Sequence, residues 1–253
     1  MAHIDLNADI GESFGVWRMG HDTDLVPLVS SANIACGYHA GDSRTMTDSV
    51  EHCLRHGVAV GAHPSYPDRE GFGRREMALS PREIREAVLY QVGALAGIAA
   101  AAGGRLVHVK PHGALYNRAA IDAAAAEAIA CAVRDLDSSL ALVGLAGSLL
   151  PAAGRAAGLR VLEEGFADRR YTARGLLASR GEARAMIEDP GEAEAQVLAM
   201  VCGGEVSAIG GEPVRLRIDT VCLHGDGPQA VVFARQLRAA LARAGIVVRA
   251  PLA

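Results

Sequence analysis

Aromatic residues are scarce in this chain: they make up 4% of its 253 residues, although half of the residues are hydrophobic. The core must therefore be packed mainly by alanine, valine and leucine side chains. Long basic tracts are absent as well, and the formal net charge is −4. Because a nucleic acid needs a positively charged stripe on its partner, the composition argues against a nucleic-acid-binding protein.

Cysteine is sparse, and its spacing shows no metal-binding pattern. The five cysteines are odd in number, and no two form a Cys-x-x-Cys pair. We therefore expect reduced thiols rather than a disulfide framework or a structural zinc site. The first residues also lack the charged and apolar regions of a signal peptide. The most apolar stretch, residues 87–102, is too short to span a bilayer, so we expect a soluble, cytoplasmic protein without a membrane partner.

Two motifs of well-known enzyme classes are missing. There is no G-x-x-x-x-G-K-[ST] sequence, so ATP would have to bind without a P-loop. There is no G-x-S-x-G sequence either, which argues against a serine hydrolase with a nucleophile elbow. The segment Gly225-Asp226-Gly227 matches a dinucleotide fingerprint only weakly, because no acidic residue follows about 20 positions later. As the start of a helix, this segment could instead bind a phosphate.

The sequence does contain a regular alternation of strand-like and helix-like segments. Strands are predicted near residues 3–9, 32–36, 58–62, 105–110, 140–145, 159–163 and 218–223. Helices are predicted near residues 42–56, 81–102, 119–134, 147–157, 189–202 and 228–244. This alternation indicates parallel strands joined by right-handed crossovers. The length fits one domain spanning residues 1–253, which we predict to be an α/β fold with a seven-stranded (β/α) barrel.

The distribution of polar residues favours a barrel over an open, doubly wound sheet. In an open sheet, functional residues concentrate near one switch point. Here nearly every predicted strand ends in His, Asp, Gly or Lys, from Asp9 to Asp226. Such a distribution is expected where loops surround the mouth of a barrel.

Carboxylates and histidines follow the first three strands. Asp9 and Glu12 stand three residues apart and could bind a cation or divide acid and base roles. Asn7 and Asp9 share one strand face, and because Asn and Asp are poor strand formers, function is favoured over loop capping. His39 and His63 follow the next two strands, each close to a glycine that permits near backbone approach. Two histidines at successive strand ends favour a functional role over a structural one.

The segment from Lys110 to Asn117 carries the most specific local signal. A lysine at the end of an apolar strand is costly to bury unless it meets an anion. That anion could be a substrate carboxylate, a phosphate, or a neighbouring carboxylate in a structural ion pair. His112 follows two residues later. Arg169, after the sixth predicted strand, could clamp a carboxylate or a phosphate, or lie in a solvated turn.

The amino-acid sequences of these segments resemble those of the LamB/YcsF family, and the resemblance runs from about residue 3 to residue 248. The resemblance is carried by Asp5–Glu12, Ser31–Asp42, Gly61–Pro64, Val109–Asn117 and His224–Asp226. That family is identified with the A subunit of the prokaryotic ATP-dependent 5-oxoprolinase. The resemblance implies a barrel akin to the glycoside hydrolase/deacetylase superfamily and ATP-driven opening of 5-oxo-L-proline to L-glutamate, with B and C subunits as partners. One departure lies at residues 179–185, where the family tends to have a Pro-Arg…Pro-Gly-Ala loop.

This chemistry assigns roles to the strand-end residues. We expect Lys110 and the loop Gly225–Gly227 to bind an anion, and Asp9 or Glu12 to act as a base or to bind Mg²⁺. The remaining candidates for proton transfer or metal binding are His39, His63, His112, His224 and Asp226. The candidates for contact with substrate or phosphate are Asn7, Tyr116, Asn117, Arg169, Gly225 and Gly227.

Two other functions stay open at this point. The first is a metal-dependent amidase or deacetylase, in which Asp9, His39 and His63 hold a divalent ion that activates water. The second is a non-catalytic subunit that presents the substrate to its partners. The sequence also leaves open whether the chain forms a homo-oligomer.

Overall fold

The strands close into a parallel barrel in the computed structural model, which describes residues 2–224 and 230–250. In spatial order they are β1 (His3–Ile10), β2 (Ser31–Ala35), β3 (Ala59–His63), β4 (His108–Val109), β5 (Ala141–Leu145), β6 (Arg160–Phe166) and β9 (Thr220–His224). β9 pairs with β1 in parallel, with Asp9 opposite His224, and this pairing closes the barrel. The predicted seven-stranded (β/α) barrel is therefore confirmed.

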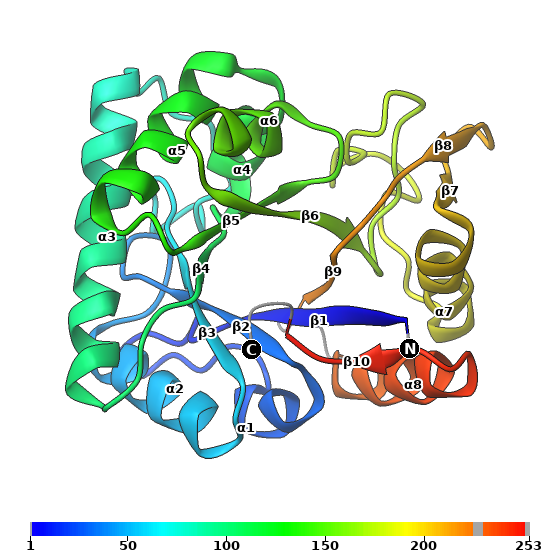
Figure 1. Cartoon of the computed structure of the whole chain (residues 1–253), viewed down its shortest axis with the longest axis horizontal. Coiled ribbons are helices and arrows are strands. Elements are labelled where there is room, and N and C mark those ends of the chain that lie inside the picture. Colours follow the sequence, from blue (N-terminus) through cyan, green and yellow to red (C-terminus); the bar gives the residue numbers. More distant parts are fainter. Residues whose placement is uncertain (1, 225–229, 251–253) are drawn as a thin grey trace.

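Helices surround the strands on the outside (Figure 1). They are α1 (Asp22–Leu25), α2 (Ser43–Arg55), α3 (Pro81–Ala101), α4 (Gly113–Ile121), α5 (Ala123–Leu136), α6 (Leu149–Ala156), α7 (Pro190–Leu198) and α8 (Ala230–Arg243). The sequence Ser80-Pro81-Arg82-Glu83 predicts the start of α3, and Ser80 does form a capping box with Glu83. The sequence also predicts Asp42 as a helix cap, and Asp42 does cap α2 by accepting a hydrogen bond from the Thr45 amide.

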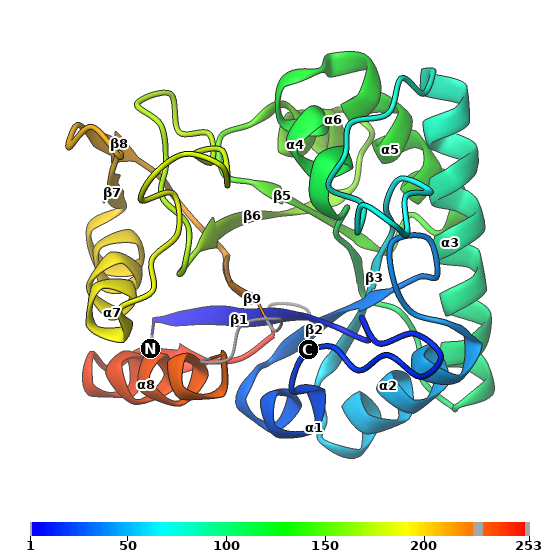
Figure 2. The ribbon, with the colours of Figure 1, turned by 180° about the vertical axis from the view of Figure 1, so that it is seen from behind.

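Several features differ from the predicted elements. The predicted helix at 119–134 is two helices, because Asp122 ends α4 and caps α5 through the amides of Ala124 and Ala125. Between β6 and β9 the chain also forms an antiparallel hairpin of β7 (Glu205–Ser207) and β8 (Pro213–Arg215), which the strand periodicity did not predict. The hairpin and α7 lie together beside the barrel, on the side away from α3 (Figure 2). The short strand β10 (Val247–Val248) adds to the edge of β1.

The apolar stretch at residues 87–102 belongs to α3, in agreement with the helix predicted at residues 81–102. α3 spans 21 residues, so by length and composition alone it could cross a membrane, and the prediction that it is too short was wrong. One helix of this kind is weak evidence for a membrane span. In the fold, α3 packs against α2, α5 and β3 and covers the outside of the barrel.

The barrel interior is polar, and the apolar core lies between the strands and the helices. Alternate residues of β1 point in opposite directions, so that Leu6 and Ile10 pack in the apolar core. Asn7, on the opposite face, donates to Glu164 and Thr220 inside the barrel. A polar interior provides hydrogen-bonding partners for charged groups below the barrel mouth.

Candidate functional site

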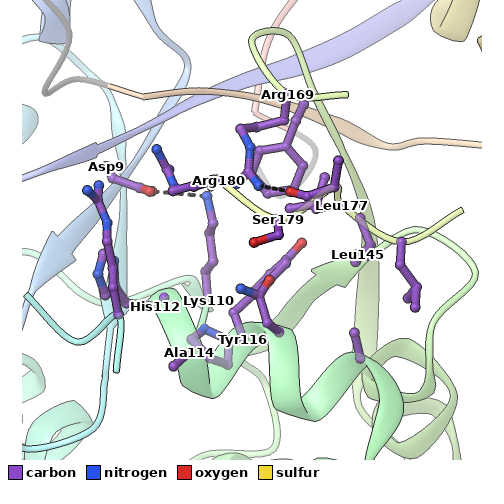
Figure 3. Close-up of a pocket in the computed structure, with 18 of the residues that line it drawn as sticks. Asp9, Lys110, His112, Ala114, Tyr116, Leu145, Arg169, Leu177, Ser179 and Arg180 are labelled. Carbon is purple, nitrogen blue, oxygen red and sulfur yellow. Dashed lines mark hydrogen bonds and ion pairs between the residues drawn. The ribbon is translucent and has the colours of Figure 1, made fainter. Parts of the chain in front are cut away.

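A cavity of about 460 Å³ opens at the carboxyl ends of the barrel strands. Figure 3 shows Asp9, Lys110 and His112 on one side of this cavity and Arg169 and Leu177 on the other. Its polar lining residues are Asp9, His63, Arg74, Lys110, His112, Tyr116, Asn117, Arg169, Ser179 and Arg180. The predicted residues from strands β1, β3, β4 and β6 therefore meet at one site.

Lys110 is the only lysine in the sequence, and it is buried at the base of this cavity. Its Nζ lies 3.0 Å from Oδ1 of Asp9 and 2.9 Å from Oε1 of Glu164. The ammonium also donates to Asn7 Oδ1 at 3.3 Å and contacts Cys222 Sγ at 3.0 Å. Burial disfavours the charged form, but Asp9 and these neighbours raise the pKa of Lys110 well above its usual value. The structural ion pair considered from the sequence is thus present, and an additional substrate anion stays a prediction.

Glu164 is the buried group that sequence reasoning missed. Its side chain is fully buried, and it accepts hydrogen bonds from Asn7 Nδ2 at 3.0 Å and Tyr116 Oη at 2.7 Å. The predicted residues Asn7 and Tyr116 therefore both donate to Glu164, and Tyr116 also lines the cavity. Their contact with substrate or phosphate stays a prediction. A signal was present in the sequence: Leu162, Glu164 and Phe166 alternate on one strand face, and a carboxylate on such a face needs partners.

Four side chains gather beside Asp9 in a second cluster, the histidine cluster, which consists of Glu12, His39, His63 and His112. One ligand atom from each of the four lies within 4.8 Å of the others, and all four side chains are buried. Nε2 of His39 lies 3.2 Å from Oε1 of Glu12, and Nε2 of His63 lies 3.3 Å from Oδ2 of Asp9. The structure therefore brings together the six candidates from the first four strands, and Asp9 bridges the histidine cluster and Lys110.

Main-chain carbonyls determine which nitrogen of two imidazoles carries the proton. Nδ1 of His63 donates to the carbonyl oxygen of Lys110 at 2.7 Å, and Nε2 of His112 donates to the carbonyl oxygen of Phe72 at 2.9 Å. In the neutral rings, the lone pairs of His63 Nε2 and His112 Nδ1 then face each other at 3.0 Å. Two facing lone pairs repel unless a proton or a cation lies between them.

The surroundings of His39 and His112 disfavour protonation of these two imidazoles. Burial and the neighbouring His63 lower the pKa of His39 well below its usual value. Burial and the neighbouring His39 do the same to the pKa of His112. Nδ1 of His39 is buried and has no hydrogen-bond partner among the described residues. Neutral imidazoles with unshared lone pairs are metal ligands, so the residues of the histidine cluster fit a divalent cation.

A buried arginine lies on the opposite side of the cavity from Asp9 and His112 (Figure 3). Arg169 is buried and donates to the carbonyl oxygen of Ala178 at 2.6 Å, whereas its Nε has no hydrogen-bond partner in the described part of the chain. Burial, with Arg180 close by, lowers the pKa of Arg169 to about 10. Arg74 and Arg180 also line the cavity and were not singled out from the sequence. Arg180 lies in the 179–185 loop, at the point where the sequence departs from the family pattern.

The predicted residues at the end of β9 are only partly described. β9 ends at His224, whose backbone pairs with Asp9. Gly225, Asp226 and Gly227 lie outside the described residues, so the predicted phosphate-binding loop stays a prediction. Asn117 lines the cavity beside Tyr116, on the first turns of α4.

The chain is similar to known proteins over nearly its whole length. The sequence matches the LamB/YcsF family over residues 4–253. It is 64% identical to the A subunit of 5-oxoprolinase from Methylococcus capsulatus, over 98% of this chain and 95% of the relative. It is 58% identical to the corresponding 5-oxoprolinase subunit from Tolumonas auensis, over 99% of this chain and 100% of the relative.

A solved structure agrees with these relatives. The crystal structure of the lactam utilization protein from Thermus thermophilus superposes with a TM-score of 0.92 at 50% identity. The superposition covers 98% of this chain and 99% of that one. The barrel, the full-length match and the level of identity lead to one conclusion: this chain belongs to the LamB/YcsF family.

Proposed function

We propose that this chain is the A subunit of a cytoplasmic, ATP-dependent 5-oxoprolinase, which hydrolyses 5-oxo-L-proline to L-glutamate. The names of the two relatives support the substrate, and the name of the Thermus protein supports a lactam. The structural observation that carries the proposal is Asp9, whose two oxygens contact Lys110 and His63 at the base of an open cavity. A carboxylate held in this way beside imidazoles can receive a proton from water.

The reaction demands several groups at once. A five-membered lactam is an unstrained amide, so neither its rate of hydrolysis nor its equilibrium is favourable. Phosphorylation of the lactam oxygen by ATP makes C5 open to attack by water. Breaking the ring C–N bond then needs a proton for the departing nitrogen and yields an acyl phosphate, which a second water converts to glutamate and phosphate. The site must therefore supply a base, a proton donor and an anion contact.

The residues of the cavity match these needs. We assign the base to Asp9 or Glu12, and proton transfer to the imidazoles of His63 and His112. We assign the substrate carboxylate to Arg169, because no carboxylate of the described residues lies within hydrogen-bonding distance of its charge and its Nε has an unused donor. Lys110 already has two carboxylate partners, so its contribution is to hold Asp9 in place and to balance charge that develops in the reaction.

The residues of the histidine cluster favour a divalent metal ion as cofactor. Glu12, His39, His63 and His112 would hold a divalent ion, which would supply a Lewis acid and lower the pKa of a bound water. Three imidazoles and one carboxylate suit zinc or a similar transition metal better than Mg²⁺, which prefers oxygen ligands. This donor set supports the second candidate function, a metal-dependent amidase or deacetylase. Glu12 stands in place of the predicted ligand Asp9, and His112 is added to the predicted His39 and His63.

The proposed reaction requires ATP and partner subunits. The sequence contains no P-loop, so we propose that the phosphorylation step involves the B and C subunits and that Mg²⁺ enters with ATP. The word "subunit" in the names of the relatives supports a multi-subunit complex.

One experiment separates the three candidate functions. The full chain is combined with candidate B and C subunits, and glutamate and ADP are measured with 5-oxo-L-proline, with and without ATP. We expect glutamate only with ATP and all three proteins, and a loss of about 100-fold or more in the Lys110→Met variant. The matched control is Arg82→Met, which replaces an exposed cation on α3. Hydrolysis by the metal-loaded chain without ATP would identify an amidase, and full turnover of the Lys110→Met complex would overturn the catalytic assignment.

A further inference from the structure

Phe72 has an unusual backbone conformation beside the histidine cluster. Its φ is +54°, and only one other non-glycine residue in the described ranges, Arg184, has a positive φ. An aromatic side chain disfavours this left-handed conformation, so the surrounding structure must hold it in place.

The turn around Phe72 is held by main-chain hydrogen bonds on both sides. The Phe72 amide donates to the Arg69 carbonyl at 3.1 Å, and the Gly73 amide donates to the Asp68 carbonyl at 2.7 Å. Asp68 also accepts from the Gly71 amide through its side chain. A Cβ at Gly73 would lie 2.9 Å from both His112 and His39, so the turn approaches the cluster as closely as glycine allows.

This conformation brings the Phe72 carbonyl to His112 Nε2, at 2.9 Å. The Phe72 ring meets the His112 and His39 rings edge-on, with centroids 5.2 Å and 5.4 Å away. His39 and His112 stack on each other at 3.8 Å. Phe72 thus contacts two imidazoles of the cluster without offering a ligand atom of its own.

We propose that Phe72 is a positioning residue: its left-handed backbone keeps the proton of His112 on Nε2, so that the Nδ1 lone pair faces His63. If the carbonyl turned away, His112 would be free to carry its proton on Nδ1, and that nitrogen could no longer bind a cation. The inference rests on the metal site within the proposed function. It assigns the control of that site to a residue whose side chain is neither acid, base nor ligand.

Two substitutions separate the backbone from the ring. Phe72→Asn and Phe72→Val both remove the ring, but asparagine tolerates a positive φ and a β-branched valine does not. The control is the same pair at Arg184, an exposed left-handed residue outside the cavity lining. It reports the general effect of backbone strain on the fold.

The first measurement is the imidazole tautomer of His112, from ¹⁵N chemical shifts in the metal-free chain. This readout depends on neither the lactam nor ATP. The second is the affinity for Zn²⁺ by calorimetric titration, with the melting temperature recorded for every variant. We expect Phe72→Asn to keep the Nε2–H tautomer and to bind Zn²⁺ within about threefold of the unaltered chain. We expect Phe72→Val to lose the tautomer and about 10–100-fold in affinity.

The outcomes are distinct. An unchanged tautomer and affinity in Phe72→Val would overturn the inference, and so would equal losses in both variants, because the ring would then be responsible. Equal losses in the Arg184 variants would assign the effect to general destabilisation and would also overturn it. Absence of Zn²⁺ binding in the unaltered chain would remove the metal site from the proposed function, while the tautomer would still test the role of Phe72.

Discussion

The Nζ of Lys110 lies 2.9 Å from Oε1 of Glu164, and both side chains are almost completely buried, with exposures of 2% and 0%. An ion pair buried to this degree is held by its surroundings as well as by its own charges. Tyr116 and Asn7 both donate to Glu164, and Asp9 accepts from Lys110. Removal of one partner therefore leaves a buried charge with too few counter-charges.

Breaking this pair should destabilise the fold. We expect Glu164→Gln to lower the free energy of unfolding by about 3 kcal/mol, because Lys110 keeps only Asp9 as a charged partner. The double variant Lys110→Met with Glu164→Gln should lose less than the sum of the two single losses. Urea unfolding of the three variants measures this, and strictly additive losses would contradict a coupled pair.

Gly61 should not tolerate a side chain. It pairs with His108 across β3 and β4, and a Cβ at this position would lie 1.9 Å from His108 Nε2. We expect Gly61→Ala to destabilise the protein by about 1–3 kcal/mol, since the buried ring must move. Gly97→Ala is the control, because Gly97 lies within α3 with no atom nearby and should gain about 0.5–1 kcal/mol. Thermal unfolding compares the two variants. Equal effects would show that displacement of the His108 ring is not the cause of the destabilisation.

His108 should make the stability depend on pH. Burial, together with nearby Lys110, lowers the pKa of His108 to about 3. The unfolded chain has a histidine pKa near ~6.5, so below that pH it takes up a proton that the folded protein excludes. The contribution of His108 is then fully present above about pH 6.5 and is lost as the pH falls towards 3, by up to about 1.4 kcal/mol per pH unit.

The comparison with His108→Gln isolates this effect. Glutamine can still donate to Asn33 Oδ1, which accepts from His108 Nε2 at 2.7 Å. Unfolding free energies measured between pH 7.5 and 5 should decline less steeply in the variant. Parallel pH curves would show that His108 binds a proton equally in both states.

Arg169 should contribute to substrate binding rather than to folding. We expect Arg169→Gln to raise the KM for 5-oxo-L-proline about 10–100-fold in the complete enzyme, because a charged hydrogen bond to the substrate carboxylate is lost. Arg170→Gln serves as the control, since Arg170 pairs with Glu192 outside the cavity lining. Steady-state kinetics provide the measurement, and an unchanged KM in Arg169→Gln would assign the carboxylate to another group.

Much of the site could be predicted because parallel strands all end at the same edge. Asp9, His39, His63, Lys110 and His112 are each recognisable as polar residues that follow an apolar strand. The barrel itself follows from their distribution around nearly every strand end. Glu164 was missed because it lies within a strand, where periodicity marks a buried face but does not reveal a buried charge.

Contacts between distant residues could not be predicted in the same way. Asp9 and Lys110 stand 101 positions apart, and their ion pair exists only because β1 and β4 belong to one closed barrel. The same holds for the lone pairs of His63 and His112, which depend on the carbonyls of Lys110 and Phe72. A sequence shows which residues can ionise, but burial and neighbours determine which of them do.

The sequence alone determined the alternation of strands and helices, the caps at Ser80 and Asp42, and the chemical character of the strand ends. These depend on local periodicity and on hydrogen bonds within a few residues. Tertiary structure alone decided that Lys110 meets Glu164, that Arg169 faces the cavity, and that His112 carries its proton on Nε2. Each of these depends on the closure of the barrel, which places groups from distant segments within hydrogen-bonding distance in a buried, weakly screened interior.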